Sequence, residues 1–183
     1  DNKSNQTLWI LGDSHASSLY LAGEHVANSL EMNLKSYLSG GTYFPPSDIY
    51  RQSNKKKDLR KLNDFKFVEK VLYRQIKVGD VILLSMRFPS YFGGTYYGGS
   101  LGFRFNRKDG SFVSQENYFN EWISSVENLA DIAQKQGAKV IIQTPTPEWE
   151  KEYINPSCST SGIQWFNSRG KTNCQIKSEF FVD

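Results

Sequence analysis

Histidine and cysteine are scarce in this chain of 183 residues, which holds two of each. His15 and His25 are too few for a zinc site of three histidines, and Cys158 and Cys174 lack a CxxC partner, so no metal site is expected. No run of about 18 apolar residues occurs, so no transmembrane helix is expected in this stretch. Net charge is only +3, from 22 Lys and Arg against 19 Asp and Glu, which does not by itself indicate nucleic-acid binding.

The two cysteines leave two interpretations open. Cys158 and Cys174 lie in a polar, irregular part of the chain with 15 residues between them. One disulfide between them would place the domain outside the cytosol. Two free thiols in a cytosolic protein are the alternative.

Positive charge is concentrated in one short segment. Its six basic residues are Arg51, Lys55, Lys56, Lys57, Arg60 and Lys61. This density favours a solvated loop or helix start over a binding site for a polyanion.

The length of the chain predicts a single domain over residues 1–183. The chain has no initiator Met and no signal peptide, and it opens on a polar run. We therefore interpret it as a piece of a longer protein.

Apolar patterning predicts alternating strands and helices. Continuous apolar runs indicate strands over 7–11, 34–38, 81–86 and 138–143. Apolar spacings of three and four predict helices over 16–30, about 63–77 and 118–136. Ser114 or Asn117 is expected to cap the last helix, and Gly137 to end it. Residues 89–113, rich in glycine and aromatic residues, predict an inserted loop or hairpin that turns at Asp109-Gly110.

This alternation predicts a flavodoxin-like three-layer α/β/α fold with a parallel sheet. In such folds, ligands bind at the carboxyl ends of the strands. Those ends are predicted at residues 12–15, 39–42, 86–89 and 144–147.

Ser14 is the strongest candidate for chemistry. It follows the first predicted strand directly and stands where the first helix begins. Unpaired N–H groups at a helix N-terminus would stabilise an oxyanion beside this serine. The alternative is that Ser14 or Asp13 only caps the helix.

The string Gly12-Asp13-Ser14-His15-Ala16 resembles block I of the SGNH/GDSL hydrolase superfamily. It resembles most the SGNH domains fused behind acyltransferase-3 membrane proteins, which O-acetylate surface polysaccharides. Three further features agree: Thr42-Tyr43-Phe44-Pro45-Pro46, Met86-Arg87-Phe88, and the late cysteine pair with Trp165 between. The resemblance spans nearly the whole chain and implies the SGNH hydrolase fold.

The resemblance also implies roles for individual residues. Ser14 would be the nucleophile, and the backbone N–H groups of Ser14 and of Gly40 or Gly41 would hold the oxyanion. Arg87 stands where the superfamily has an oxyanion-binding Asn. It would replace that donor or bind a substrate carboxylate or phosphate, with a structural ion pair as the alternative. Asp13 and His15 would line the site.

A general base for Ser14 is not evident in the sequence. His25 lies about 16 Å away along the same predicted helix, and His15 diverges from Ser14 by about 100° around it. The superfamily's late Asp-x-x-His block has no counterpart here. Either the chain ends before that block, which we expect, or the protein has lost it. Asp183 is not assigned as the acid, because no histidine follows it.

The function implied is extracytoplasmic O-acyl transfer, with acetyl as the expected group. A cell-surface carbohydrate such as lipopolysaccharide would be the acceptor. An N-terminal membrane domain of the parent chain would handle the donor, ultimately acetyl-CoA, so this domain would need no cofactor. It would lie on the periplasmic or extracellular face of the membrane. The alternatives are a secreted carbohydrate esterase and an inactive carbohydrate-binding module. Tyr96 and Tyr97 are candidates for sugar stacking, or for a small core under their loop.

Overall fold

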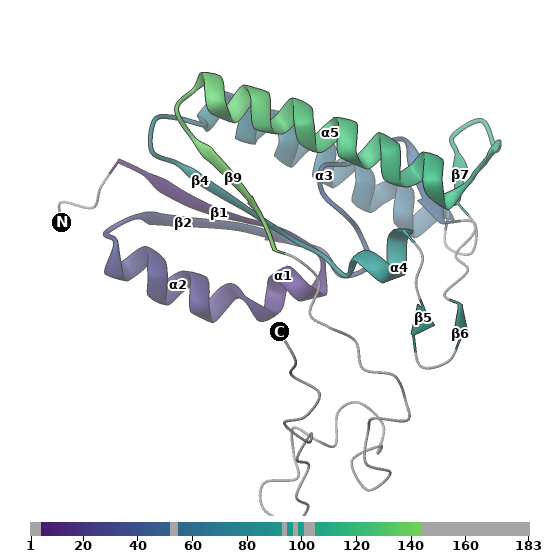
Figure 1. Cartoon of the computed structure of the whole chain (residues 1–183), viewed down its shortest axis with the longest axis horizontal. Coiled ribbons are helices and arrows are strands. Elements are labelled where there is room, and N and C mark those ends of the chain that lie inside the picture. The colour runs from purple at the N-terminus through teal and green to yellow at the C-terminus, as the bar shows by residue number, and fades with distance from the viewer. Residues whose placement is uncertain (1–4, 52–54, 93–94, 97–98, 101–104, 144–183) are drawn as a thin grey trace, which may run out of the picture. The chain divides into compact units, whose positions relative to one another are not determined.

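Four parallel strands form the main sheet of the computed structural model, which describes residues 5–51, 55–92, 95–96, 99–100 and 105–143. They are β1 (Thr7–Gly12), β2 (Asn33–Leu38), β4 (Val81–Ser85) and β9 (Lys139–Ile142), in the order β2-β1-β4-β9 (Figure 1). Trp9 lies opposite Lys35 of β2 on one side and Ile82 of β4 on the other. All four predicted strands are confirmed to within two residues.

Helices cover both faces of this sheet. α1 (Ser14–Ser18) and α2 (Tyr20–Ser29) lie on one face, and α3 (Lys55–Gln75) and α5 (Gln115–Lys135) lie on the other (Figure 1). The three-layer α/β/α fold with a parallel sheet is therefore confirmed. In this sheet, β1 lies between β2 and β4, and β9 follows β4. This is the strand order of flavodoxin-like folds.

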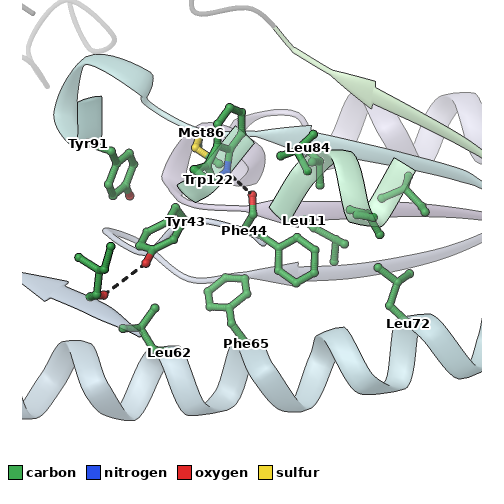
Figure 2. Packing of buried hydrophobic residues seen from close by; sticks show 14 of the residues in the cluster. Leu11, Tyr43, Phe44, Leu62, Phe65, Leu72, Leu84, Met86, Tyr91 and Trp122 are labelled. Atoms are coloured by element: carbon green, nitrogen blue, oxygen red, sulfur yellow. Dashed lines mark hydrogen bonds between the residues drawn. The ribbon is translucent and has the colours of Figure 1, made fainter. Parts of the chain in front are cut away.

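Alternating side chains of β1 supply both cores. Leu8 and Ile10 pack with residues of α1 and α2 in a small cluster. Trp9 and Leu11 point to the opposite face and join the large core under α3 and α5. Figure 2 shows this core, in which Leu11, Phe65 and Leu72 meet across the layer. Every residue of β1 is buried, because the strand lies inside the sheet.

Part of the insertion predicted over 89–113 pairs with residues 49–51 in a small antiparallel sheet. Its strands are β3 (Ile49–Arg51), β7 (Phe105–Arg107) and β8 (Phe112–Val113). The predicted turn at Asp109-Gly110 is confirmed: Asp109 accepts hydrogen bonds from Ser111, and Gly110 has φ +89°. The prediction of a loop is wrong at its start, where α4 (Phe88–Phe92) forms. β5 (Thr95–Tyr96) and β6 (Gly99–Ser100) pair with each other as a separate hairpin.

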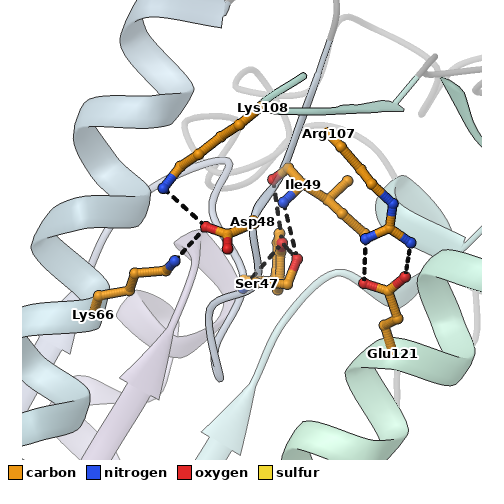
Figure 3. Close-up of polar contacts among 8 residues, drawn as sticks. Ser47, Asp48, Ile49, Lys66, Arg107, Lys108 and Glu121 are labelled. Carbon is orange, nitrogen blue, oxygen red and sulfur yellow. Dashed lines mark hydrogen bonds and ion pairs between the residues drawn. The ribbon is translucent and has the colours of Figure 1, made fainter. Parts of the chain in front are cut away.

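Ion pairs tie this small sheet to the long helices (Figure 3). Asp48, just before β3, accepts from Lys66 of α3 and lies 3.0 Å from Lys108. The hydrogen bonds from these two lysines hold the pKa of the Asp48 carboxyl below its ordinary value. Arg107 of β7 donates two hydrogen bonds to Glu121 of α5.

The bounds of all three predicted helices need correction. α3 starts at Lys55, eight residues before the predicted start. The basic residues from Lys55 to Lys61 therefore lie at the beginning of a helix, whereas Arg51 ends β3. The first two turns of α3 are mostly polar and carried no apolar stripe. The helix predicted over 16–30 is interrupted at Leu19, which separates α1 from α2. The helix predicted over 118–136 begins at Gln115, with Ser114 as its cap.

Some predictions concern residues outside the described ones. These are the loop over 144–147, Tyr97, and the cysteines Cys158 and Cys174. The side chain of Tyr96 is also outside the described set. Across the described ranges, no helix combines the length and apolar character needed to cross a membrane.

Asp80 fixes the edge of the sheet opposite the carboxyl ends of the strands. Its fully buried carboxylate accepts from the backbone N–H of Thr7 at 2.7 Å, from Trp9 Nε1 at 3.3 Å and from the backbone N–H of Lys77 at 3.2 Å. One side chain therefore joins the start of β1 to the turn before β4.

We expect Asp80→Ala to lower the free energy of unfolding by about 2–4 kcal/mol, because it leaves buried donors without an acceptor. Urea unfolding measures the loss. Glu127→Ala, which removes an exposed carboxylate from α5, is the control and should stay within about 0.5 kcal/mol of the parent protein. Equal losses in both variants would contradict the anchoring role of Asp80.

Candidate functional site

The candidate site lies where β1 and β4 end side by side. After β1 the chain crosses to β2 on one side, whereas β4 leads to β9 on the other. The strand order therefore reverses between β1 and β4, and ligands of open α/β sheets bind in the crevice at such a point. Ser14 follows β1, and Arg87 follows β4 by two residues.

Asp13 connects the two strand ends. Its carboxylate is 2% exposed and accepts three hydrogen bonds. Oδ1 accepts from the backbone N–H of His15 at 2.8 Å, and Oδ2 accepts from the backbone N–H of Arg87 at 3.0 Å and from the Tyr91 hydroxyl at 2.9 Å. Asp13 is therefore the N-cap of α1, and both of its carboxylate oxygens accept hydrogen bonds that hold the fold together.

Ser14 is the first residue of α1 and is exposed. Because Asp13 caps the helix, the side chain of Ser14 is not needed for capping. In the described part of the chain, neither its hydroxyl nor its N–H makes a hydrogen bond. Both groups can therefore act on a bound ligand.

The close approach of β1 and β4 requires glycine before Asp13. Gly12 has φ +148°, and a Cβ atom there would lie 1.8 Å from the backbone oxygen of Ser85. No side chain fits in that space. The Gly of the Gly12-Asp13-Ser14 string is thus explained by packing between two strands.

Gly40 and Gly41 lie in the turn that follows β2. The N–H of Ser39 donates to the carbonyl of Gly12 at 3.0 Å, which holds this turn beside the end of β1. Gly41 has φ +72°, a conformation that favours glycine. No hydrogen bond from the N–H of Gly40 or Gly41 is found among the described residues, so both donors remain available.

Arg87 is half-buried, and its backbone N–H is committed to Asp13. Any role for Arg87 in holding an oxyanion would therefore fall to its guanidinium. Tyr91, which the sequence analysis missed, reaches Asp13 from α4. Pro89 is compatible with a first helical turn, but the surrounding glycines obscured that signal.

The two histidines have different surroundings. His25 is exposed on α2. The His15 side chain is 35% exposed, and its Nδ1 lies 3.7 Å from Asp13 Oδ1, too far for a hydrogen bond. Neither histidine bonds to Ser14 in the described structure, so no base is assigned.

The segment over 42–46 is structural in its main contacts. Trp122 Nε1 donates to the carbonyl of Phe44 at 3.0 Å (Figure 2), and Tyr43 contacts Ser47 through its hydroxyl. Burial raises the pKa of Tyr43 to about 12, so this phenol stays neutral near pH 7. This segment follows the turn of Gly40 and Gly41 directly, and the N–H of Thr42 donates to the carbonyl of Ser39 at 3.1 Å across that turn.

Comparison with protein families gives one match over almost the whole chain. The model of the SGNH domain fused to AT3 (acyltransferase-3) domains matches residues 1–181. The chain belongs to this SGNH family. A search of curated proteins found no match. The resemblance inferred from the sequence motifs is thus confirmed.

Membership connects the SGNH domain with hydrolase or acyltransferase chemistry and with AT3 membrane domains. Of the residues implied by the resemblance, Asp13, Ser14 and His15 lie together at the start of α1, and the N–H of Arg87 donates to Asp13. The turn with Gly40 and Gly41 is held beside them by the bond from the N–H of Ser39 to Gly12. Among the described residues, no cluster of three or more His, Cys, Asp or Glu could hold a metal ion.

Gly12→Ala should lower the free energy of unfolding by more than about 4 kcal/mol, because its Cβ would overlap a backbone oxygen. Thermal unfolding followed by circular dichroism tests this. Gly40→Ala is the matched control, since a Cβ there meets nothing within 4 Å. A Gly12→Ala protein as stable as Gly40→Ala would show that β1 and β4 are not this close.

Tyr91→Phe should cost about 1.5–3 kcal/mol of unfolding free energy, because a buried carboxylate loses one of its donors. Chemical denaturation measures the change. Tyr20→Phe on α2 should change stability by less than about 0.5 kcal/mol. An unchanged Tyr91→Phe midpoint would argue against the bond to Asp13.

Proposed function

We propose that this SGNH domain is a serine acyltransferase that passes an acyl group, expected to be acetyl, to a hydroxyl of a cell-surface carbohydrate. One observation supports it above the others: an exposed serine with unused hydroxyl and N–H groups stands at the switch point of the sheet. Family membership supports the same chemistry.

The reaction would proceed in two steps through an ester on Ser14. Ser14 Oγ attacks the acyl carbonyl carbon and gives its proton to a base, and the bond to the donor's leaving group breaks. The acceptor hydroxyl then attacks the ester carbonyl carbon, and Ser14 Oγ regains a proton. In this proposal, the described residues would supply the nucleophile and the oxyanion donors. The Asp-x-x-His block of the family would supply the base.

Negative charge develops on the carbonyl oxygen in both steps. The N–H groups of Ser14 and of Gly40 or Gly41 are proposed to hold that oxygen, since none of them is used within the described structure. Arg87 would add a charged donor through its side chain. Asp13 would hold the start of α1 and the loop of Arg87 together through its hydrogen bonds.

Transfer is favoured over hydrolysis by the fusion of this family to AT3 domains. We propose that an AT3 domain of the parent protein hands the acyl group to Ser14 on the outer face of the membrane. The carbohydrate acceptor, extracytoplasmic location and Cys158–Cys174 disulfide belong to this proposal.

The test uses the domain within its parent protein and 4-nitrophenyl acetate as the acyl donor. Ser14→Ala should lower the release of nitrophenolate by roughly 10³-fold or more and remove the acetyl adduct seen by mass spectrometry. Ser29→Ala, on the exposed face of α2, serves as the control. Unchanged turnover in Ser14→Ala would refute the assignment of the nucleophile.

Adding an oligosaccharide acceptor separates transfer from hydrolysis. Transfer predicts acetylated sugar and faster loss of the Ser14 adduct. Free acetate alone, at an unchanged rate, would support the esterase alternative. A stable fold without any adduct in the complete protein would support the inactive binding module.

A further inference from the structure

An apolar cleft of about 330 Å³ opens at the β2 edge of the sheet, on the side covered by α3. Pockets for small ligands have volumes of about 300–1,000 Å³ and mostly apolar walls. The walls here are formed by Trp9, Leu11, Lys35, Ser36, Tyr37, Phe67, Val68 and Val71. None of these residues belongs to the candidate active site.

The strand register explains the floor of the cleft. Trp9 pairs with Lys35, and Leu11 pairs with Tyr37, so their side chains share the face toward α3. β2 is the outermost strand of the described sheet, so beyond it the floor has no neighbouring strand (Figure 1). The cleft is therefore open along one edge.

Phe67 is the unusual member of the wall. The inner face of α3 buries Phe65 and Leu72, whereas Phe67 is 69% exposed. Phe67 and Val71 are four residues apart, which places them on one helix face. An exposed phenylalanine beside an apolar cleft indicates a site for a ligand, because covering the ring with an apolar group would remove it from water.

The charges around the cleft are unevenly placed. Lys35 Nζ lies 4.7 Å from the centre of the Trp9 ring and donates to Gln75 Oε1 at 2.6 Å. Lys70 and Arg74 are exposed, and each stands three residues after a wall residue of α3. The end of the cleft near Gln75 is therefore cationic.

Tyr37 closes the other part of the cleft wall. Its pKa is raised by burial and, less strongly, by the negative charge of Asp64. Lys35 is the charged side chain of the cleft wall, and it bonds to Gln75. An anionic group would be attracted to Lys35, and this attraction would orient an amphipathic ligand.

We propose that this cleft binds a single-chain amphiphile with an anionic head group. The head group would pair with Lys35 at the end near Gln75, with Lys70 and Arg74 adding to the positive potential. The chain would lie along Phe67, Val68 and Val71 above Trp9. This site is independent of acyl transfer at Ser14.

The experiment titrates the protein with decanoate, below the concentration at which it forms micelles, and follows the methyl signals of Val68 and Val71 by NMR. Saturable shifts of these methyls are expected. Decanol, which has the same chain without charge, should bind about fivefold more weakly, and decyltrimethylammonium more weakly still.

Two variants separate the head-group contact from the chain contact. Lys35→Met should weaken decanoate about fivefold and leave decanol unchanged, whereas Lys57→Met, an exposed lysine nearer the start of α3, should change neither. Phe67→Ala should weaken both ligands. Its ring is largely exposed, so this variant is expected to fold. Thermal unfolding checks that.

Several results would overturn the proposal. Equal affinity for decanoate and decyltrimethylammonium would refute the preference for an anionic head group. Equal affinity of Lys35→Met and Lys57→Met for decanoate would refute the contact with Lys35. Nuclear Overhauser effects from Val68 or Val71 to residues 144–183 in the free protein would show that the chain itself fills the cleft. Binding to anionic vesicles without any response to decanoate would identify a membrane surface instead.

Discussion

The carboxylate of Asp13 is the interaction on which the candidate site depends. A buried charge is tolerated only when its hydrogen bonds are satisfied, and Asp13 accepts from the start of α1, from the loop after β4 and from α4. The Asp13 side chain bonds to all three segments, in addition to the backbone bond from the N–H of Asp13 to the carbonyl of Ser85. Asp13, which takes no part in the proposed chemistry, therefore helps to set the position of Ser14 relative to Arg87.

The close contact between β1 and β4 supports that arrangement. Gly12 lets the two strands approach, and the turn with Gly40 and Gly41 attaches to Gly12 through the N–H of Ser39. The open donors at the switch point are thus held by backbone packing. β2 borders both functional surfaces, since it lines the proposed cleft and ends just before the glycine turn.

Prediction from the sequence succeeded where local patterns and tertiary packing agree. β1 and β4 are continuous apolar runs in the centre of a parallel sheet, and α5 has a clear apolar stripe with Ser114 at its start. Prediction failed for elements that have no apolar pattern of their own and depend on contacts with residues distant in the sequence. The first turns of α3 are polar, and α4 forms next to glycine-rich segments, where its Tyr91 bonds to Asp13 across 78 residues.

The sequence alone determined the order of the four main strands and the long helices, and the family, and it made Ser14 the candidate nucleophile, because these depend on periodicity and on one short string. Only the tertiary structure decided that Asp13 caps the helix, that the N–H of Arg87 is already used, and that Tyr91 belongs to the site. The cleft beside Phe67 is likewise a property of the edge of the sheet. Hydrogen bonds and clefts between distant segments have no local sequence pattern, so they become visible only when the strands are assembled.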